Sequence, residues 1–370
     1  MINKNKGNLN FAKYITSMNT SFSNDFYSST VTIGDISLRG DGVSFNEKTA
    51  KLSAMGEYIE RYVQGTLSHK IKDKYQEAFN VNSEQVEKVH VLDIIMPKYF
   101  LFEENEGREW NDSSGTAFHT SSFNAIDGAF LEFIERQSLV YKWLLKSPGK
   151  KIDLSHYAKK NKKIEKAYQN LKSYFLEIES FEISITEKCK VVITIATSKL
   201  NKSVGLGSAW DVESAIFKSL KETWQLISHK SPAHLNINYD SYIEESTEEG
   251  KGINLYADYF HDLTVNDIKK SYEFLDDGGV YHCTGNVVKR PDDFIYVNEM
   301  KSIGEELNVE LLIAYLPSSI EHLSGHTVKI IGKGGFPHIK TDIIDPYKYT
   351  IKNVYKNKVI PNNGIMIPFS

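Results

Sequence analysis

An acidic helical segment occurs more than once in this chain, and this repetition limits the possible folds more than any other sequence feature. In residues 125–136, AIDGAFLEFIER, the apolar residues recur at the spacing of one helix face. Glu132, Glu135 and Arg136 are three and four residues apart, so they lie together on the helix surface. Taken alone, such a group of charges is typical of any solvated helix.

Two further copies argue against that simple explanation. Residues 50–61, AKLSAMGEYIER, match at two alanines, both glutamates and the arginine, and a weaker copy begins at Ala215 with Gln225 in place of the second glutamate. A glycine stands 17 residues before the first glutamate of each copy, in the pairs Gly40 and Glu57, Gly115 and Glu132, and Gly205 and Glu222. We therefore predict an α+β fold with internally repeated strand–glycine turn–helix units whose acidic helix faces converge.

Converging carboxylates repel one another, so they imply a bound cation. Glutamate oxygens are hard ligands that suit Mg²⁺, and Mg²⁺ commonly completes its coordination with water and substrate phosphates. The predicted ligand is therefore Mg²⁺ with a nucleotide, and the predicted metal ligands are Glu57, Glu60, Glu132 and Glu135. The chain has no Gly-x-x-x-x-Gly-Lys-[Ser/Thr] loop, which excludes a P-loop site.

Three motifs together resemble the YcaO domain. They are Ser53-Ala54-x-x-Glu57-x-x-Glu60-Arg61, Glu132-x-x-Glu135-Arg136 and Lys218-x-x-x-Glu222-x-x-Gln225. Within that family, the run from Glu132 to Trp143 and the ending Ile367-Pro-Phe-Ser370 are most similar to the cyclodehydratase subunits of microcin thiazole/oxazole synthetases. The motifs cover about residues 30–230, and the remainder shows little likeness apart from that ending.

This resemblance implies both a fold and a reaction. YcaO domains bind Mg²⁺ and ATP without a P-loop and activate peptide-bond oxygens by phosphorylation. The chain is thus expected to form a single YcaO-like domain around a Mg-ATP site. Its implied reaction is the ATP-dependent cyclodehydration of Cys, Ser or Thr in a ribosomally made precursor peptide, which gives thiazoline or oxazoline rings. Thioamide or amidine formation by the same fold remains an alternative.

The resemblance also assigns roles to individual residues. It implies that Arg136 contacts the transferring phosphate and that the carboxylate of Ser370 is a candidate general base, so both are predicted to be catalytic. The predicted nucleotide contacts are Arg136, Thr120, Lys218 and Glu222. Lys218 stands where arginine is more usual in the family, and lysine keeps the charge but loses the forked geometry.

Thr120 stands where an asparagine is common in the family and can still offer a hydroxyl. Two other departures from the family pattern are Asp41, where a lysine is common, and Ala117, where a serine is common. These two motivate another alternative, a non-catalytic docking subunit of a peptide-modifying complex. The intact acidic pairs argue for the enzyme.

The resemblance further implies partners. We expect a precursor peptide as substrate and, because no leader-binding domain precedes the motifs, a separate E1-like subunit that binds the leader peptide. An FMN-dependent azoline dehydrogenase is the third expected partner.

The composition fits a reduced, cytoplasmic protein. A net charge of −4 over 370 residues, without a basic stripe, predicts no nucleic-acid partner. Only Cys189 and Cys283 are present, without a Cys-x-x-Cys pair, so a disulfide framework and a thiolate zinc site are not expected. The N-terminus lacks the apolar run of a signal peptide and no stretch is long enough to span a membrane, so no membrane association is predicted.

The remaining patterns predict the order of the elements. Residues 1–28 are predicted to be a polar arm and residues 29–370 one domain, since no Pro-, Gly- or Ser-rich linker divides them. Strands are expected at 29–38, 89–95, 309–316 and 327–331, a hairpin at 181–185 and 190–196, and helices at about 46–64, up to 145, at 164–178 and up to 228. Turns are expected at 39–42 and 205–207.

Overall fold

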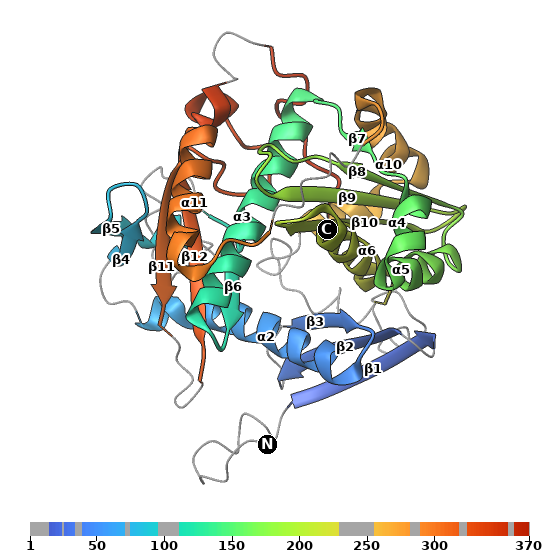
Figure 1. Ribbon diagram of the computed structural model, residues 1–370, viewed down its shortest axis with the longest axis horizontal. Helices are drawn as coiled ribbons and strands as arrows, with labels where there is room; N and C mark the ends of the chain where they lie inside the picture. The colour runs from blue at the N-terminus through green and yellow to red at the C-terminus, as the bar shows by residue number, and fades with distance from the viewer. Residues whose placement is uncertain are drawn as a thin grey trace.

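The structure is a computed structural model of the chain. It describes residues 15–23, 26–33, 39–70, 75–94, 111–228, 255–281, 289–317, 324–353 and 359–369. Three antiparallel sheets and the helices packed against them make up this part of the chain (Figure 1).

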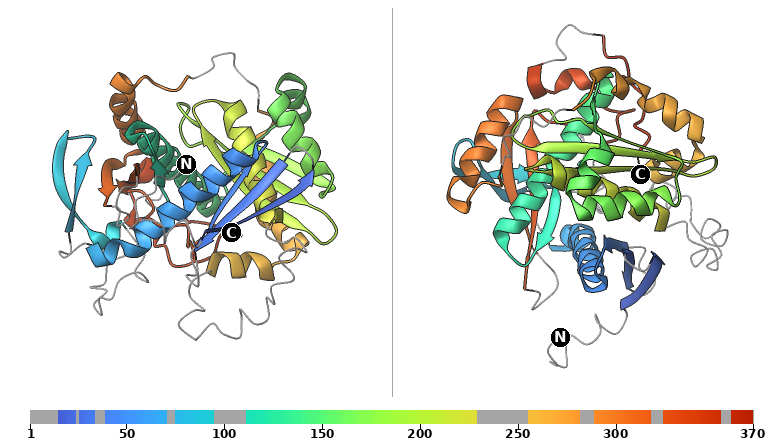
Figure 2. Two further views of the ribbon diagram at one scale, coloured as in Figure 1. Left: turned by 90° about the horizontal axis from the view of Figure 1, so that it is seen from below. Right: turned by 45° about the vertical axis from the view of Figure 1, so that its right-hand side comes forward.

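The first sheet has the strand order β1-β2-β3 and lies at the bottom of Figure 1. Its strands are β1 (Ile15–Ser23), β2 (Phe26–Ile33) and β3 (Arg39–Ser44). Helix α2 (Glu47–Lys70) follows β3 directly and packs along this sheet, as both views in Figure 2 show. The same helix also contacts strands of the second sheet, so it joins the two.

The second sheet combines early and late parts of the chain in the order β5-β4-β11-β12-β6. Its strands are β4 (Tyr75–Asn80), β5 (Gln85–His90), β6 (Thr116–His119), β11 (Glu310–Leu316) and β12 (His326–Lys333). Because β6 pairs only with β12, the strand that precedes the central helix is held in place by the C-terminal part of the chain.

The third sheet has the order β10-β9-β8-β7. Its strands are β7 (Lys150–Lys151), β8 (Glu177–Glu182), β9 (Lys190–Thr197) and β10 (Lys202–Ala209), and helices α4 (Leu154–Lys160), α5 (Lys162–Lys172) and α6 (Val212–Ser228) accompany it. Every residue of β9 and β10 is buried, because α6 packs against both strands and the central helix α3 also contacts both.

Helix α3 (Ser122–Leu145) runs through the centre of the molecule between the second and third sheets (Figure 1). The Ser121 side chain caps its first turn by accepting from the Asn124 N–H. Lys146 ends the helix in the left-handed conformation, with a φ of 45°. Apolar residues occur around most of its circumference, which is the pattern of a helix covered on several sides.

The remaining described elements lie outside the three sheets. They are helices α9 (Leu255–Asp262), α10 (Val265–Tyr272) and α11 (Asp293–Leu307) and the 3₁₀ turns η1 (Val91–Asp93), η4 (Glu273–Gly278), η5 (Pro346–Lys348) and η6 (Ile351–Asn353). Helix α11 packs beside β11 (Figure 1). The C-terminal segment binds along α3, since Trp143 Nε1 donates to the Ile365 carbonyl at 2.9 Å. Among these described helices, none has the length and apolarity that crossing a bilayer demands.

The α+β prediction is confirmed, as are the three long helices, the 181–196 hairpin and the two late strands. The predicted turns at 39–42 and 205–207 are wrong, because these residues lie in β3 and β10. Of the three predicted turn glycines only Gly115, with a φ of +74°, has a conformation that favours glycine. The helix predicted at 164–178 stops at Lys172, and its last residues begin β8.

The predicted N-terminal arm contains regular structure. Strand β1 and the first residues of β2 fall within residues 1–28, and β1 pairs antiparallel with β2. The first 14 residues lie outside the described part of the chain. The division of the chain at residue 28 stays a prediction.

Close approach between strand and helix explains the glycines that are not in turns. A Cβ atom at Gly40 would lie 2.2 Å from the Ala54 carbonyl oxygen of α2, and one at Gly205 would lie 2.3 Å from the Thr223 nitrogen of α6. Three strand–helix pairs, each 11 residues apart, touch in the same way: Gly42 with Ser53, Ala117 with Gly128, and Gly207 with Lys218. In the middle pair the glycine is on the helix, so one small residue per pair suffices to bring helix and strand together.

Candidate active site

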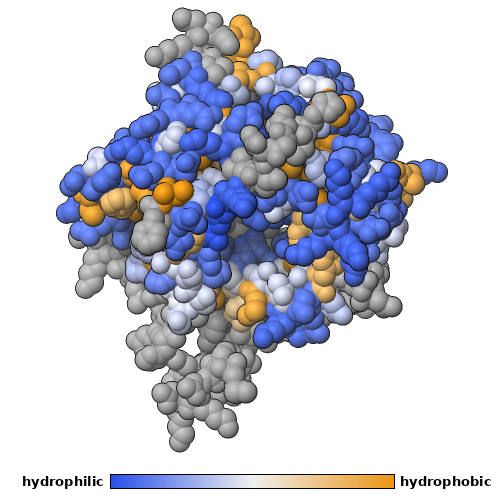
Figure 3. Space-filling model, in the orientation of Figure 1, coloured by the Kyte–Doolittle hydropathy of each residue, from blue (hydrophilic) through white to orange (hydrophobic). Residues whose placement is uncertain are grey.

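Helices α2, α3 and α6 enclose a cavity of about 440 Å³ together with strand β10 and the approach to β6. It is lined by Glu57, Glu60, Arg61, Gln64, Ser113, Thr116, Gly128, Leu131, Glu132, Glu135, Arg136, Leu206, Gly207, Ser208, Lys218, Lys221, Glu222 and Gln225. Figure 3 shows a hollow with hydrophilic walls in the middle of this face, where these elements meet in Figure 1.

The predicted acidic residues therefore converge as expected. Glu57 and Glu60 come from α2, Glu132 and Glu135 from α3, and Glu222 from α6. Each helix follows its strand closely and packs against it, so the side chains on its cavity face reach the same space from three directions. The prediction that these carboxylates meet is confirmed by the geometry, while their role as ligands stays a prediction.

Two of the glutamates are fixed by a backbone N–H of the preceding strand. Glu57 Oε2 accepts from the Asp41 N–H at 2.8 Å, and Glu222 Oε2 accepts from the Leu206 N–H at 2.6 Å. Both donors stand 16 residues before their glutamate and immediately after a close-packed glycine. Glu60 of α2 is instead held by strand β6, because its Oε1 accepts from the Phe118 N–H at 2.8 Å.

Glu132 occupies the matching position in the middle unit but is held differently. The corresponding strand donor, the Thr116 N–H, is bonded to the Ser113 carbonyl at 3.2 Å. No N–H of the described backbone donates to Glu132. Its cationic neighbours are Arg136 and the fully buried Lys329, whose Nζ donates to the Asp112 carbonyl at 2.7 Å.

Arg136 lies at the centre of the acidic group. Its Nη2 is 3.7 Å from Glu132, 3.8 Å from Glu135 and 3.9 Å from Glu222. The ring of Phe369 packs against the guanidinium, with 5.0 Å between Cζ and the ring centroid. Its Nη1 is buried and has no hydrogen-bond partner among the residues that the structure describes.

Burial and mutual repulsion raise the pKa values of three cavity carboxyls, those of Glu60, Glu132 and Glu222. Burial raises the pKa of Glu132 to about 7, and the charge of Glu135 adds to the effect while Arg136 opposes it. Burial and then Glu135 raise the pKa of Glu222 to about 8, and burial and then Glu132 raise that of Glu60 well above its usual range. Such carboxyls are expected to release their protons when a cation binds, because the cation favours the ionised form.

The pKa of the Arg136 guanidinium is also raised, but here the raised pKa preserves the charge. Burial works to lower the pKa of Arg136, but the charges of Glu135, Glu222 and Glu132 together raise it above the ordinary value. Arg136 therefore remains charged while it is buried, and it is a permanent cation among groups that share protons.

The donor set fits Mg²⁺ and ATP. Carboxylate oxygens are the ligands that Mg²⁺ prefers, and Arg136 Nη1 is a buried donor that a phosphate oxygen could satisfy. No three acidic, His or Cys side chains of the described chain are arranged to enclose a metal by themselves.

Helix α6 contributes one face to the cavity, made by Lys218, Lys221, Glu222 and Gln225 at helical spacing. Lys218 Nζ donates to the Ser208 carbonyl at 2.8 Å. Lys221 was missed by the sequence motifs, although its position three residues after Lys218 was enough to place it on the same face. Burial, and then the charge of Lys218, lower the pKa of Lys221.

Two predicted site residues are not among the described residues that line the cavity, for different reasons. Thr120 is exposed just after the end of β6 and is not among the cavity-lining residues. Ser370 lies outside the described residues, but its neighbour Phe369 contacts Arg136. Of the two departures from the family pattern, Asp41 is buried and accepts a hydrogen bond from Thr30 Oγ1 at 2.6 Å, and Ala117 packs beside Gly128.

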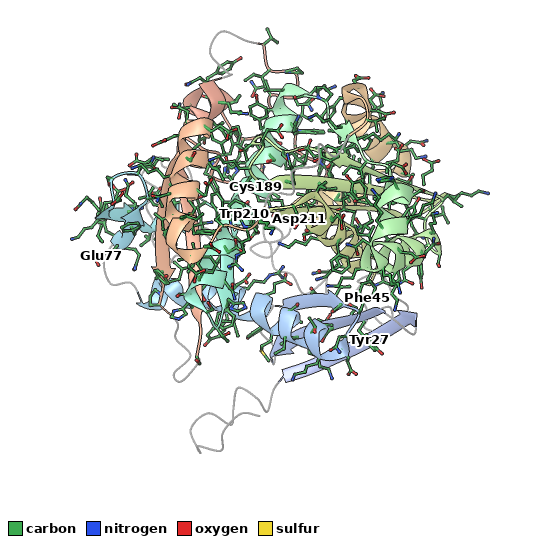
Figure 4. All side chains as sticks on the ribbon, viewed as in Figure 1. Tyr27, Phe45, Glu77, Cys189, Trp210 and Asp211 are labelled. Atoms are coloured by element: carbon green, nitrogen blue, oxygen red, sulfur yellow. The ribbon has the colours of Figure 1, made fainter. Side chains whose placement is uncertain are left out.

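Trp210 stabilises the junction between α3 and β10 next to the cavity. Its indole Nε1 donates to Asp127 Oδ1 at 2.8 Å, and its ring stacks on Phe130 with 6.0 Å between centroids. Figure 4 labels Trp210 and Asp211 at this junction, near the middle of the molecule. Tyr296 of α11 donates to the same Asp127 oxygen at 2.8 Å, so helix α11 also contacts this junction.

Comparison with known proteins gives a family match over half of the chain. Residues 93–277 match the family model described as YcaO cyclodehydratase, ATP- and Mg²⁺-binding. This description names Mg²⁺, which the acidic pairs predicted, and ATP, which the resemblance implied.

One curated protein is related in sequence. The chain is 27% identical over 165 residues to the microcin B17-processing protein McbD of Escherichia coli. The match covers 43% of this chain and 41% of McbD, so it spans well under two thirds of the relative's length.

Solved structures share the fold across nearly the whole chain. A chain of the E. coli McbBCD microcin synthetase complex with pro-MccB17 bound superposes with a TM-score of 0.69 at 17% identity, covering 96% of both chains. YcaO from Methanopyrus kandleri, bound with AMPPCP and Mg²⁺, superposes with a TM-score of 0.64 at 14% identity, covering 92% of this chain and 90% of that one.

Proposed function

This chain belongs to the YcaO family, and from that premise we propose that it is an ATP-dependent peptide cyclodehydratase. In the proposed reaction, Cys, Ser or Thr residues of a ribosomally made precursor peptide become thiazoline or oxazoline rings. The observation that carries the proposal is the meeting of five glutamates and Arg136, from three separate helices, around one cavity.

Each group of residues has a proposed task. Glu57, Glu60, Glu132 and Glu135 would hold Mg²⁺, which supplies charge neutralisation between the protein and the triphosphate. Arg136 is already fixed among three carboxylates and has Nη1 to spare, so it can bind a phosphate oxygen without reorganising. Glu222 and Lys218 lie on the same cavity wall and are proposed nucleotide contacts, and Thr120 is proposed as a further one.

The chemistry balances as one dehydration per ATP. The side-chain sulfur or oxygen of the substrate residue attacks the preceding amide carbon and loses its proton to a base. The former carbonyl oxygen then takes the γ-phosphoryl group, and ADP leaves. Loss of phosphate, with the amide proton, forms the carbon–nitrogen double bond of the ring, so the peptide loses the atoms of one water molecule.

The base is proposed to be the carboxylate of Ser370. Support comes from the neighbouring residues, because Phe369 packs on Arg136 and the Pro368 carbonyl accepts from Tyr272 Oη at 3.0 Å. These contacts bring the C-terminal segment to the cavity wall. They favour a role for the tail in positioning the phosphorylated group.

The proposed partners follow from the likeness to a microcin synthetase. The McbBCD complex contains several proteins and has been seen with pro-MccB17 bound. By analogy, we propose that this chain acts on a precursor peptide together with an E1-like subunit that binds the leader and an FMN-dependent azoline dehydrogenase.

Reconstitution tests this function directly. The purified chain, precursor and partner proteins are incubated with Mg²⁺ and ATP while phosphate release and peptide mass are followed. The expected result is one phosphate released for each water mass lost from the peptide, and no loss with Glu132→Gln.

Other outcomes distinguish the alternatives. A mass change of sulfur for oxygen would favour thioamide formation and overturn cyclodehydration. Unchanged peptide together with no measurable binding of Mg²⁺-ATP would favour the non-catalytic docking subunit.

A further inference from the structure

Four cationic side chains line the cavity, and three of them are already engaged by the protein. They are Arg61, Arg136, Lys218 and Lys221. Arg61 Nη2 is 2.6 Å from Glu57 Oε1, Arg136 lies among three carboxylates, and Lys218 Nζ donates to a backbone carbonyl.

Lys221 differs from the other three cations. Its only recorded contact is with the ring of Phe217, at 5.9 Å from Nζ to the centroid, which is the outer limit of a cation–π interaction. It makes no hydrogen bond or ion pair with the described residues. A half-buried ammonium without an anion is unfavourable, so this position is suited to a ligand that brings negative charge.

The residue beneath Lys221 gives it a defined position. Phe217 stacks on Phe45, with 5.6 Å between ring centroids and 24° between planes. Phe45 follows β3 and thus links the first sheet to α6, and Figure 4 labels it where these two parts meet. The side chain of Lys221 therefore leaves α6 beside a ring that is held in place by its stacking on Phe45.

The distribution of charge in the cavity indicates what Lys221 meets. The glutamates would hold Mg²⁺, and cationic side chains would be required to balance the remaining negative charge of a bound triphosphate. On α6, Lys218 already gives one of its hydrogen bonds to Ser208, whereas the donors of Lys221 are uncommitted among described groups. Mutual repulsion between these two ammonium groups would also be relieved by an anion bound beside them.

We propose that Lys221 supplies the main phosphate-binding charge of helix α6, with Lys218 positioned by Ser208 in a supporting role. The assignment rests on the proposed function, because it takes Mg²⁺-ATP as the occupant of the cavity. It moves the principal basic contact of this helix from Lys218, where the motif put it, to Lys221.

Calorimetric binding of Mg²⁺-ATP to the full chain tests the assignment. Lys221→Met is expected to weaken binding about 10- to 100-fold, the usual value of a hydrogen bond to a charged group. Lys218→Met is expected to weaken it about threefold or less. Lys221→Arg is expected to restore most of the affinity, since it returns the charge.

Control measurements separate binding from folding. Lys163→Met removes an exposed lysine of α5, far from the cavity lining, and is expected to bind as the unaltered chain does. Thermal unfolding without ligand is expected to show Lys221→Met at least as stable as the unaltered chain, because an unpaired charge has been removed. A structural role would instead lower its stability and would not be rescued by arginine.

Two results would overturn the assignment while leaving the function intact. They are unaltered affinity in Lys221→Met, and a larger loss in Lys218→Met than in Lys221→Met. Absence of Mg²⁺-ATP binding by the unaltered chain would instead overturn the proposed function, and the assignment with it.

Discussion

The middle strand–helix unit, β6–α3, holds its first glutamate differently from the two outer units, β3–α2 and β10–α6. In β3–α2 and β10–α6, the glutamate accepts a hydrogen bond from the strand, from Asp41 and Leu206 respectively. In β6–α3, the Thr116 N–H donates to the Ser113 carbonyl, and no backbone N–H of the described chain donates to Glu132.

This difference shows how one local geometry can serve two purposes. A carboxylate that accepts from the backbone is fixed and contributes to packing its helix against the strand. A carboxylate without such a donor keeps its lone pairs for a ligand, but its charge is costly while the ligand is absent. The middle unit is thus the one whose acidic residue is most available to a metal ion.

The largest expected effect comes from neutralising the glutamate of the middle unit. Glu132→Gln is expected to weaken Mg²⁺-dependent ATP binding by about 100-fold or more, since even residues that only support a metal ligand cost 10- to 100-fold. The same change should raise thermal stability without ligand, because it removes a buried, repelled charge. Calorimetry and thermal unfolding measure the two effects.

Glu57→Gln is the matched variant for this comparison. Its carboxylate accepts from Asp41 and contacts Arg61, so the change should lower ligand-free stability. Equal signs of the stability change in both variants would contradict the distinction between the units.

The next effect concerns the close approach of strand and helix. A Cβ at Gly207 would lie 2.3 Å from the Ser219 nitrogen, so Gly207→Ala is expected to destabilise the protein by about 3 kcal/mol. Gly128→Ala in the middle unit would meet only the Ala117 Cβ, at 3.1 Å, and should cost about 1 kcal/mol. Denaturant unfolding measures both values.

Gly56→Ala is the control for these glycine substitutions. Its nearest neighbour would be a Phe118 ring atom at 4.0 Å, so the change should stabilise helix α2 by about 0.5–1 kcal/mol. If Gly207→Ala were equally harmless, the strand and helix would not be packed as closely as described.

A pH dependence of intermediate size follows from the cavity carboxyls. The pKa of Glu132 is about 7 in the folded protein against an ordinary 4.5, so the folded state binds more protons between these values. With respect to this group, the stability of the ligand-free protein is highest below about pH 4.5 and falls by about 3 kcal/mol as the pH rises to 7. Melting temperatures measured across this range check the slope.

The raised pKa values of Glu60 and Glu222 act in the same direction. Glu132→Gln should reduce the slope, and saturating Mg²⁺-ATP should reduce or reverse it, because bound Mg²⁺ favours the ionised carboxylates. A stability that rises with pH in the ligand-free protein would contradict these shifts.

The smallest effect is expected at the arginine of the first unit. Arg61 has the same motif position as Arg136, but its side chain is 45% exposed and its recorded ion pair is with Glu57 four residues away. Arg61→Met should change stability by no more than about 0.5 kcal/mol. Arg136→Met, which leaves three buried carboxylates without their shared cation, should be far more destabilising in the same thermal unfolding assay.

The repeated motif was sufficient to predict the core of the site. The equal spacing from glycine to glutamate indicates that Glu57, Glu132 and Glu222 converge, although the glycines differ in role: Gly40 and Gly205 pack against a helix, and Gly115 has a positive φ. The late strands β11 and β12 were also evident, because their β-branched and apolar runs have no competing helical period.

Other features could not be predicted because they depend on tertiary contacts. Glycine pairs such as Gly40-Asp-Gly42 have the composition of a turn, yet here they serve close helix packing within a strand. The contact of Phe369 with Arg136 joins residues far apart in the sequence, and no periodic pattern in the C-terminal segment indicates it. Lys221 is not a motif position, and it belongs to the site because it shares the cavity face of α6 with Lys218, Glu222 and Gln225.

The three acidic helices are far apart along the chain, and this affects how the protein must be made. During synthesis, Glu222 leaves the ribosome 90 residues after Glu132, which corresponds to a delay of roughly 5–20 seconds. Throughout that interval, the first two acidic helices exist without the third. Nucleotide can therefore stabilise the finished protein but cannot guide its early folding, and the growing chain must tolerate its own accumulated negative charge until the final helix docks.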